Sequence, residues 1–120
     1  MPQREQALQE WFSLWLRCRN LLFCSSPAGR VIGWQAGKRA KRAGYVAGFP
    51  DVAIFEPRGI WHGLFIELKF QNSNIPTVQK DWRAKLIAKG YQAMIMPGNL
   101  SFEEAQEWLE KKTEEYLQSV

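Results

Sequence analysis

The sequence predicts an α/β fold in which a mixed β-sheet is flanked by helices. Three observations support this class. Apolar residues recur at helical spacing in the first segment, two short apolar runs flank a turn in the middle, and a third apolar run lies between two later helical segments. The chain has 120 residues, of which 46% are hydrophobic and 23% charged. We therefore expect one globular domain spanning residues 1–120.

The first segment predicts an amphipathic helix from Gln3 to about Cys18. Its apolar stripe consists of Leu8, Trp11, Phe12, Trp15 and Leu16. Glu5 lies at the margin of this stripe, because residues three and four apart share a helix face. Leu21–Phe23 is a candidate strand, and the small and turn-forming residues of 25–29 predict a turn or loop.

The middle of the chain predicts a short basic helix and a hairpin. The helix is expected over Gln35–Ala43 and is ended by Gly44. The apolar runs Val52–Phe55 and Gly63–Phe70 predict two strands, joined by a turn at Pro57–Gly59.

The last third predicts helix, strand and helix. Pro76 suits the first position of a helix and Gly90 suits its end. Tyr91–Met96 predicts a further apolar strand. Ser101–Glu104 has the pattern of a capping box and opens a final helix.

Ionisable residues interrupt the apolar hairpin. Antiparallel pairing about Gly59 places Asp51 opposite Glu67, since each lies eight residues from that glycine. Lys69 points to the same face as Glu67, because side chains alternate along a strand. The other face receives Leu64, Ile66, Leu68 and Phe70, which a helix can cover. A slip of one residue would separate the carboxylate pair.

Two carboxylates this close repel, and each should raise the pKa of the other. Both can stay ionised when a divalent cation lies between them, and carboxylate oxygens with waters suit Mg²⁺ or Mn²⁺. A lysine beside them can hold or deprotonate a water, or neutralise charge on a phosphate. The pattern favours metal-assisted attack of water on a phosphodiester, with Glu5 as a further carboxylate. In the structural alternative, Glu-x-Lys on a strand is a solvated edge or a cross-strand ion pair.

Charge is distributed unevenly along the chain, whose formal net charge is +4. No acidic residue occurs between Glu10 and Asp51, and the charged residues after Ser101 are mostly acidic. The stretch between Glu10 and Asp51 contains seven basic residues, which are Arg17, Arg19, Arg30, Lys38, Arg39, Lys41 and Arg42. A one-sided basic segment is typical of a protein that binds a polyanion, usually nucleic acid. A solvated basic helix and a basic face for an acidic protein partner are the alternatives.

The composition disfavours several classes of protein. No apolar run approaches the length of a membrane span, and residues 1–11 lack the apolar core of a secretion signal, so we expect a cytoplasmic protein. Cys18 and Cys24 are expected to be free thiols. His62 is the single histidine, which argues against a Cys/His zinc site, and we assign it no role.

Taken in order, these residues resemble the VRR-NUC domains of the PD-(D/E)XK nuclease superfamily. The matching elements are Glu5–Gln9 on the first helix, Gly48–Asp51 for the PD element, Gly63–Lys69 for the ExK element, Gln79 with Trp82, and Gly90–Tyr91. The match covers most of the chain. It implies a restriction-endonuclease-like core of αβββαβ type with an extra C-terminal helix. The loop before the basic helix departs from the family pattern, because it lacks the asparagine often found there.

The resemblance also implies roles for individual residues. The catalytic residues would be Asp51, Glu67, Lys69 and Gln79, and the metal ligands would be Asp51, Glu67, the Leu68 backbone carbonyl and, as a further candidate, Glu5. Lys69 would serve the attacking water, and Gln79 would orient the site or touch the phosphate. The DNA-binding residues would be Arg30, Lys38, Arg39, Lys41 and Arg42.

The activity that the resemblance implies is that of an Mg²⁺- or Mn²⁺-dependent DNA endonuclease. Stand-alone family members resemble dimeric phage or bacterial nucleases that act on branched DNA, which implies cleavage of four-way (Holliday) junctions by a homodimer. Trp34 and Trp61 are candidates for a nucleic-acid or subunit contact, whereas the helical tryptophans Trp11, Trp15, Trp82 and Trp108 are expected in the core. The alternative is a catalytically silent nucleic-acid-binding module that keeps the fold.

Overall fold

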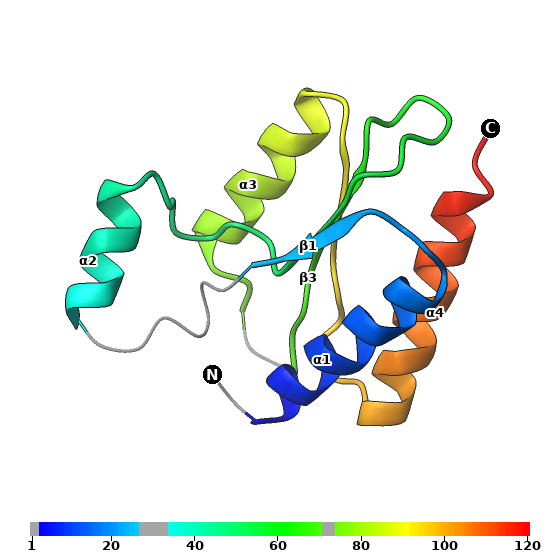
Figure 1. The fold of residues 1–120 in the computed structure, drawn as a ribbon, viewed down its shortest axis with the longest axis horizontal. Helices are drawn as coiled ribbons and strands as arrows, with labels where there is room; N and C mark the ends of the chain where they lie inside the picture. Colours follow the sequence, from blue (N-terminus) through cyan, green and yellow to red (C-terminus); the bar gives the residue numbers. More distant parts are fainter. Residues whose placement is uncertain (1–2, 27–33, 71–73) are drawn as a thin grey trace.

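A computed structural model describes residues 3–26, 34–70 and 74–120 of the chain. The elements are α1 (Gln3–Cys18), β1 (Phe23–Ser25), α2 (Trp34–Arg42), β2 (Val52–Ile54), β3 (Leu64–Glu67), α3 (Thr77–Ala88), β4 (Gln92–Ile95) and α4 (Phe102–Leu117). The sheet has the order β1-β2-β3-β4 (Figure 1); β1, β2 and β3 pair antiparallel, and β4 lies parallel to β3. The expected α/β class with a mixed sheet flanked by helices is thus confirmed.

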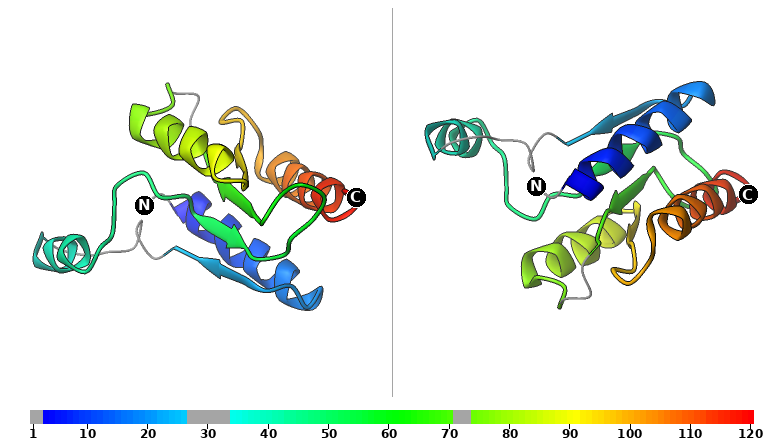
Figure 2. Two further views of the ribbon diagram at one scale, coloured as in Figure 1. Left: turned by 90° about the horizontal axis from the view of Figure 1, so that it is seen from above. Right: turned by 90° about the horizontal axis from the view of Figure 1, so that it is seen from below.

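Helices cover both faces of this sheet, as the views from above and below show (Figure 2). α1 and α4 pack on one face over the larger core, which includes Leu8, Phe12, Leu16, Val52, Ile54, Leu64, Ile66, Leu68, Met96 and Leu109. α3 covers the other face over a smaller core, whose buried members are Ala53, Phe65, Leu86 and Ala93. The apolar stripe predicted for the first helix therefore faces the larger core.

The hairpin has the predicted register. Val52 pairs with Ile66, so the next pair outward is Asp51 with Glu67. Ile66 is buried in the larger core, which turns the side chain of Glu67 to the face covered by α3. The two carboxyl groups therefore oppose each other on one face of the sheet, beside the start of α3.

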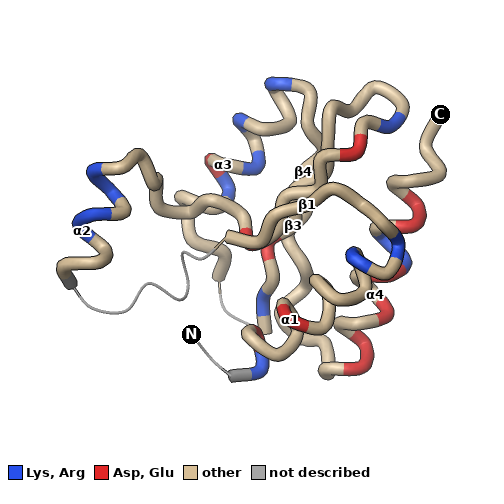
Figure 3. The backbone as a smooth tube through the Cα atoms, in the orientation of Figure 1, with Lys and Arg blue, Asp and Glu red and all other residues tan. Residues whose placement is uncertain are grey.

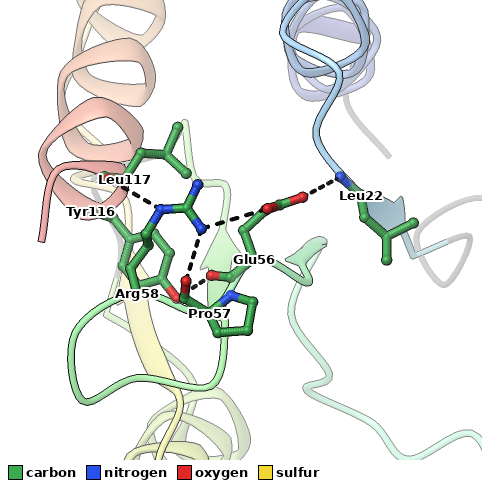
Figure 4. Close-up of polar contacts among 6 residues, drawn as sticks. All are labelled: Leu22, Glu56, Pro57, Arg58, Tyr116 and Leu117. Carbon is green, nitrogen blue, oxygen red and sulfur yellow. Dashed lines mark hydrogen bonds and ion pairs between the residues drawn. The ribbon is translucent and has the colours of Figure 1, made fainter. Parts of the chain in front are cut away.

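A polar network ties the turn end of the hairpin to the rest of the fold (Figure 4). The Glu56 carboxylate accepts a hydrogen bond from the Leu22 amide at 2.9 Å, and the Glu56 carbonyl accepts one from the Tyr116 hydroxyl at 2.7 Å. The Arg58 guanidinium donates to the Leu117 carbonyl at 3.0 Å and lies 3.6 Å from the Glu56 carboxylate. The turn is therefore attached both to the α1–β1 connection and to the C-terminal end of α4.

The first strand lies further along the chain than predicted. It runs over Phe23–Ser25 instead of Leu21–Phe23. The reason is that the Leu22 amide donates to the side chain of Glu56. The ladder with β2 therefore begins at Phe23. Residues 27–29 of the predicted loop lie outside the described part of the chain.

The third strand is shorter than predicted. β3 ends at Glu67, since the following amide, that of Leu68, donates to the Asp51 carboxylate at 2.8 Å. Lys69 consequently lies beyond the strand. Pro76 precedes α3 as its N-cap residue and is not the first helical residue.

The helix ends follow the signals read from the sequence. Gly44 follows α2 with φ 111°, and Gly90 follows α3 with φ 94°, a conformation that favours glycine. The capping box formed by Ser101 and Glu104 is present at the start of α4.

α2 stands apart from the packed layers of the molecule (Figure 1). It is joined to β2 by residues 43–51. Cys18 and Cys24 are free thiols in this structure, and both are exposed. Within the described ranges, none of the helices combines the length and the hydropathy that crossing a membrane would require.

Candidate active site

Asp51 lies at the open end of the hairpin, directly before β2. Its carboxylate accepts a hydrogen bond from the Leu68 amide at 2.8 Å. Its carbonyl accepts hydrogen bonds from the Gln9 side chain at 3.2 Å and from the Ser26 amide at 2.7 Å. Gln9 is only 1% exposed. α1 and the end of β1 thus fix the backbone of Asp51, while β3 orients its carboxylate.

Glu67 is the last residue of β3 and is 8% exposed. Its carboxyl group accepts a hydrogen bond from the Gln79 side chain at 3.1 Å and shares a hydrogen bond with the Asp51 carboxyl group. Its carbonyl accepts a hydrogen bond from the Met96 amide at 2.9 Å. The chain after β4 therefore fixes the backbone of Glu67, and α3 fixes its side chain.

Burial and mutual repulsion raise the pKa of both carboxyl groups. For Glu67 the largest cause is burial, followed by the neighbouring Asp51 and then by the charge of Glu5. Burial also raises the pKa of Asp51, and the hydrogen bonds from Glu67 and the Leu68 amide only partly oppose this effect. Burial and the mutual repulsion of the two groups therefore favour a proton on the pair when no cation is present.

Glu5 and Lys69 lie around this pair. Burial raises the pKa of Glu5, the charge of Asp51 raises it further, and the charge of Lys69 lowers it. The charge of Lys69 also lowers the pKa of Glu67. Lys69 is therefore within electrostatic range of two of the three carboxyl groups. The four residues predicted to be catalytic are brought together at one end of the sheet, with Glu5 at its border.

Tyr45 also borders the site and was missed by the sequence analysis. Burial raises the pKa of its phenol, and the charges of Glu67 and Asp51 raise it further. Its amide donates to the Ala40 carbonyl at 2.9 Å, which attaches it to α2. The only signal for it in the sequence was its place between the basic helix and the PD element. Gln9 was read only as part of a helix motif, and its contact with the Asp51 backbone was not foreseen.

Comparison with known proteins agrees with this geometry. The model of the VRR-NUC domain family matches residues 2–100. The chain belongs to the VRR-NUC family. A solved structure described as a VRR_NUC domain protein has a TM-score of 0.65 and 27% sequence identity, covering 92% of this chain and 88% of that chain. Another, described as a VRR_NUC domain, has a TM-score of 0.59 and 16% identity, covering 96% and 99%, and shows the fold alone. Among curated proteins, none matched.

The carboxyl pair of this VRR-NUC domain fits a divalent cation. Mg²⁺ is commonly held by one or two carboxylates, with waters completing its shell. The Gln79 side-chain oxygen is buried and has no hydrogen-bond partner among the described residues, so it can accept a hydrogen bond from such a water. Within 3–26, 34–70 and 74–120, no group of three or more His, Cys, Asp or Glu is arranged to hold an ion. The roles of Glu5 and the Leu68 carbonyl as ligands stay predictions.

Four of the five predicted DNA-binding residues of the VRR-NUC domain lie on α2, along which Figure 3 marks lysine and arginine positions on the backbone. Exposed on this helix are Lys38, Arg39, Lys41 and Arg42. Tyr45 follows α2 and borders the carboxyl pair, so the basic helix lies only a few residues along the chain from the site. Arg30 falls outside the described residues.

The tryptophans of the VRR-NUC domain divide largely as predicted. Trp11, Trp15 and Trp108 pack against the larger core, and Trp82 packs against the smaller one. Trp61 lies in the connection between β2 and β3, where it is partly buried and packs against the larger core; its role in a nucleic-acid or subunit contact stays a prediction. The side chain of Trp34 is outside the described part of the structure.

Proposed function

We propose that this VRR-NUC protein is a divalent-metal-dependent DNA endonuclease that hydrolyses phosphodiester bonds. One observation supports the proposal above all: the hairpin register opposes Asp51 and Glu67 at the end of β3, beside Gln79 and within range of Lys69. Burying two carboxyl groups together is unfavourable unless a cation or a proton compensates them. A catalytic role explains why the fold maintains this arrangement.

In this proposal the carboxylates of Asp51 and Glu67 would hold the divalent cation. The ion, Mg²⁺ or Mn²⁺, supplies Lewis-acid charge at the phosphate and lowers the pKa of a coordinated water. Asp51 is kept in position by the Leu68 amide, and the Leu68 carbonyl and Glu5 are further candidate ligands. The proton shared by the pair is released on metal binding, because ligating carboxylates are ionised.

Lys69 acts on the reactants, and Gln79 orients the Glu67 side chain. The Lys69 ammonium group positions the attacking water and neutralises charge that develops on the phosphate. The Gln79 amide holds Glu67 from the first turn of α3, where backbone N–H groups also favour a phosphate. Water attacks the phosphorus, the bond to the 3′ oxygen breaks, and the products carry 5′-phosphate and 3′-hydroxyl ends.

Branched DNA such as a four-way junction is the proposed substrate, and a homodimer is the proposed active form. The exposed cations of α2 would contact DNA phosphates, and a two-fold dimer would present two sites to two strands. The acidic outer surface of α4 disfavours pairing through that helix, because like charges would meet; it includes Glu107, Glu110, Glu114 and Glu115. Molar mass in solution, measured over a range of protein concentrations, tests the dimer.

Cleavage of labelled DNA tests the activity. Four-way junction, splayed-arm, single-stranded and duplex DNA are incubated with Mn²⁺, Mg²⁺ or EDTA, beside the Lys69→Ala variant. We expect metal-dependent cutting that is lost in the variant and is faster on the two branched substrates than on duplex DNA. Binding of the junction without any cutting would replace the nuclease by the silent binding module. Equal rates on all four substrates would remove the preference for branches and leave a general nuclease.

A further inference from the structure

A groove along the outer edge of β4 contains charged residues that the proposed active site does not use. β4 forms its floor, α3 and α4 form its walls, and its volume is about 660 Å³. The groove begins beside the carboxyl pair, since Ile95 of β4 pairs with Glu67 of β3, and Lys80 in its wall directly follows Gln79. A ligand lying in it would therefore extend from the site along the sheet edge.

The ionisable residues that line this groove are all cations. Lys80 and Arg83 come from α3 and Lys112 comes from α4, and no carboxylate lines the groove within the described part of the chain. Lys112 also lies 3.9 Å from Glu115, an exposed ion pair of the kind that contributes little. These side chains favour an anionic ligand.

The positive charge that α4 contributes to the groove is opposite in sign to the overall charge of the helix. The helix contains six glutamates, which Figure 3 shows as its predominant charge. Its outer surface, however, gathers Glu107, Glu110 and Glu114 with Lys111, away from the groove. The two α4 side chains that line the groove are Trp108 and Lys112. The fold therefore separates the acidic surface of α4 from a basic and aromatic one.

Trp108 provides an aromatic surface between these cations. It packs partly against the larger core, which fixes its orientation, and the rest of the side chain lines the groove. It lies one helical turn from Lys112 on the same helix face. Surfaces that bind single-stranded nucleic acids combine cations for the phosphates with aromatic rings on which bases stack.

The outer edge of β4, which forms the floor of the groove, has backbone groups that are already hydrogen-bonded to side chains and are not free to pair with another strand. The outward-facing amide of Ala93 donates to the Gln92 side-chain oxygen at 2.9 Å, and the Ala93 carbonyl accepts from Arg83 Nε at 3.1 Å. A polypeptide strand added to β4 would have to replace both hydrogen bonds. The guanidinium of Arg83 retains further N–H groups that can bind a phosphate.

We propose that this groove binds an unpaired nucleic-acid strand that continues from the strand cut at the carboxyl pair. Lys80 and Arg83 hold its phosphates, and Trp108 stacks against one of its bases. The inference rests on the proposed nuclease function and narrows its branched substrate to one that has a single-stranded segment next to the cut, as splayed-arm DNA does. α2 and α4 lie at opposite ends of the molecule (Figure 1), so the phosphate contacts proposed for α2 leave the groove free for that segment.

Charge reversal on the two walls tests the groove. Lys80→Glu combined with Lys112→Glu reverses the charge inside it. The matched control combines Lys85→Glu with Lys111→Glu, which makes the same charge change on the same two helices, because Lys85 and Lys111 line other surfaces. The dissociation constants of labelled oligothymidylate and of a duplex of equal length are measured in EDTA at several salt concentrations.

We expect the groove variant to bind oligothymidylate about tenfold or more weakly and with a flatter salt dependence. The duplex and the control variant should each change by less than about threefold. Equal losses in the two variants, or equal losses for the two ligands, would overturn the assignment of the groove to an unpaired strand. Unchanged oligothymidylate binding together with intact metal-dependent cutting would overturn the groove and leave the nuclease. A wild-type protein that binds neither ligand but still cuts branched DNA would overturn the groove and leave the nuclease.

Discussion

The two ends of the β2–β3 hairpin make different use of their polar groups. At the turn end, Glu56 pairs with Arg58 and with the Leu22 amide. At the open end, Asp51 and Glu67 face each other, and burial raises the pKa of both. Both ends are formed by the same two strands, and both are linked to helices through side-chain hydrogen bonds.

The two ends differ in the group that compensates the negative charge of their carboxylates. The turn end contains its own cation and its own donors, so its polar groups are satisfied within the fold. The open end contains two acids whose compensation is one shared proton until a cation binds. The turn end therefore contributes to stability and fixes the register, and the open end uses that register to hold a costly pair of carboxyl groups in place.

The largest expected effect is the loss of catalysis at the open end. Lys69→Ala should lower the cleavage rate by about 10²–10⁴-fold, because it removes the group that we propose positions water and neutralises phosphate charge. Single-turnover cleavage with Mn²⁺ measures it. The turn-end variant Arg58→Lys is the control and should retain the wild-type rate per folded molecule. A rate in Lys69→Ala close to that of the wild type would remove this residue from the site.

A loss of stability without a loss of chemistry is expected at the turn end. Tyr116→Phe removes the hydrogen bond to the Glu56 carbonyl and should lower the free energy of unfolding by about 1–2 kcal/mol. Urea unfolding measures this change. The rate of cleavage per folded molecule should stay unchanged. If the rate fell strongly while stability did not change, the two ends would not be separable in this way.

A glutamate-to-glutamine substitution should change the free energy of unfolding in opposite directions at the two ends of the hairpin. In the metal-free protein, the raised pKa of Glu67 means that the folded state keeps a proton which the unfolded chain loses. Its contribution to stability is complete below the ordinary glutamate value of 4.5 and is lost as pH rises toward the folded pKa. Glu67→Gln should therefore raise the free energy of unfolding at pH 8 by about 1–2 kcal/mol.

Glu56→Gln is the matched change at the turn end. It removes the charge that faces Arg58 and should lower stability by less than about 1 kcal/mol. Urea unfolding in EDTA at pH 4 and at pH 8 compares the two variants. The stabilisation by Glu67→Gln should disappear at pH 4. A destabilised Glu67→Gln protein at pH 8 would contradict the unfavourable charge of the open end.

The smallest expected effect is on α2, which belongs to neither end. Lys41→Ala combined with Arg42→Ala should weaken DNA binding and reduce the salt slope by about 1–2, because two phosphate contacts are lost. Stability should change by less than about 0.5 kcal/mol, since both side chains are exposed. Binding titrations at several salt concentrations measure the slope. An unchanged affinity would place the DNA elsewhere on the protein.

Much of the fold could be predicted because its signals are local. The hairpin register followed from Gly59 and from the alternation of apolar residues, and it determined which carboxyl groups meet. What could not be predicted depends on residues that meet only in the folded chain. β1 starts later than expected because the Leu22 amide is taken by Glu56, 34 residues away.

The candidate active site could likewise be predicted only in part from the sequence. Asp51 and Glu67 were predictable because one turn relates them. Gln9 reaches the Asp51 backbone from α1, 42 residues away, and Tyr45 reaches the pair from the end of α2. Neither residue has a charge or spacing that distinguishes it in the sequence. Their positions are consequences of packing α1 on the sheet and of the path of residues 43–51.

The side-chain bonds that occupy the edge of β4 have a consequence for the behaviour of the protein at high concentration. An exposed strand edge is a template on which other chains can add, and this is how sheet proteins begin to aggregate. Here the outward-facing amide and carbonyl of Ala93 are both bonded within the chain, to Gln92 and Arg83. Loss of the Arg83 side chain would leave that carbonyl unpaired at the sheet edge. This arginine therefore helps to keep the molecules apart from one another.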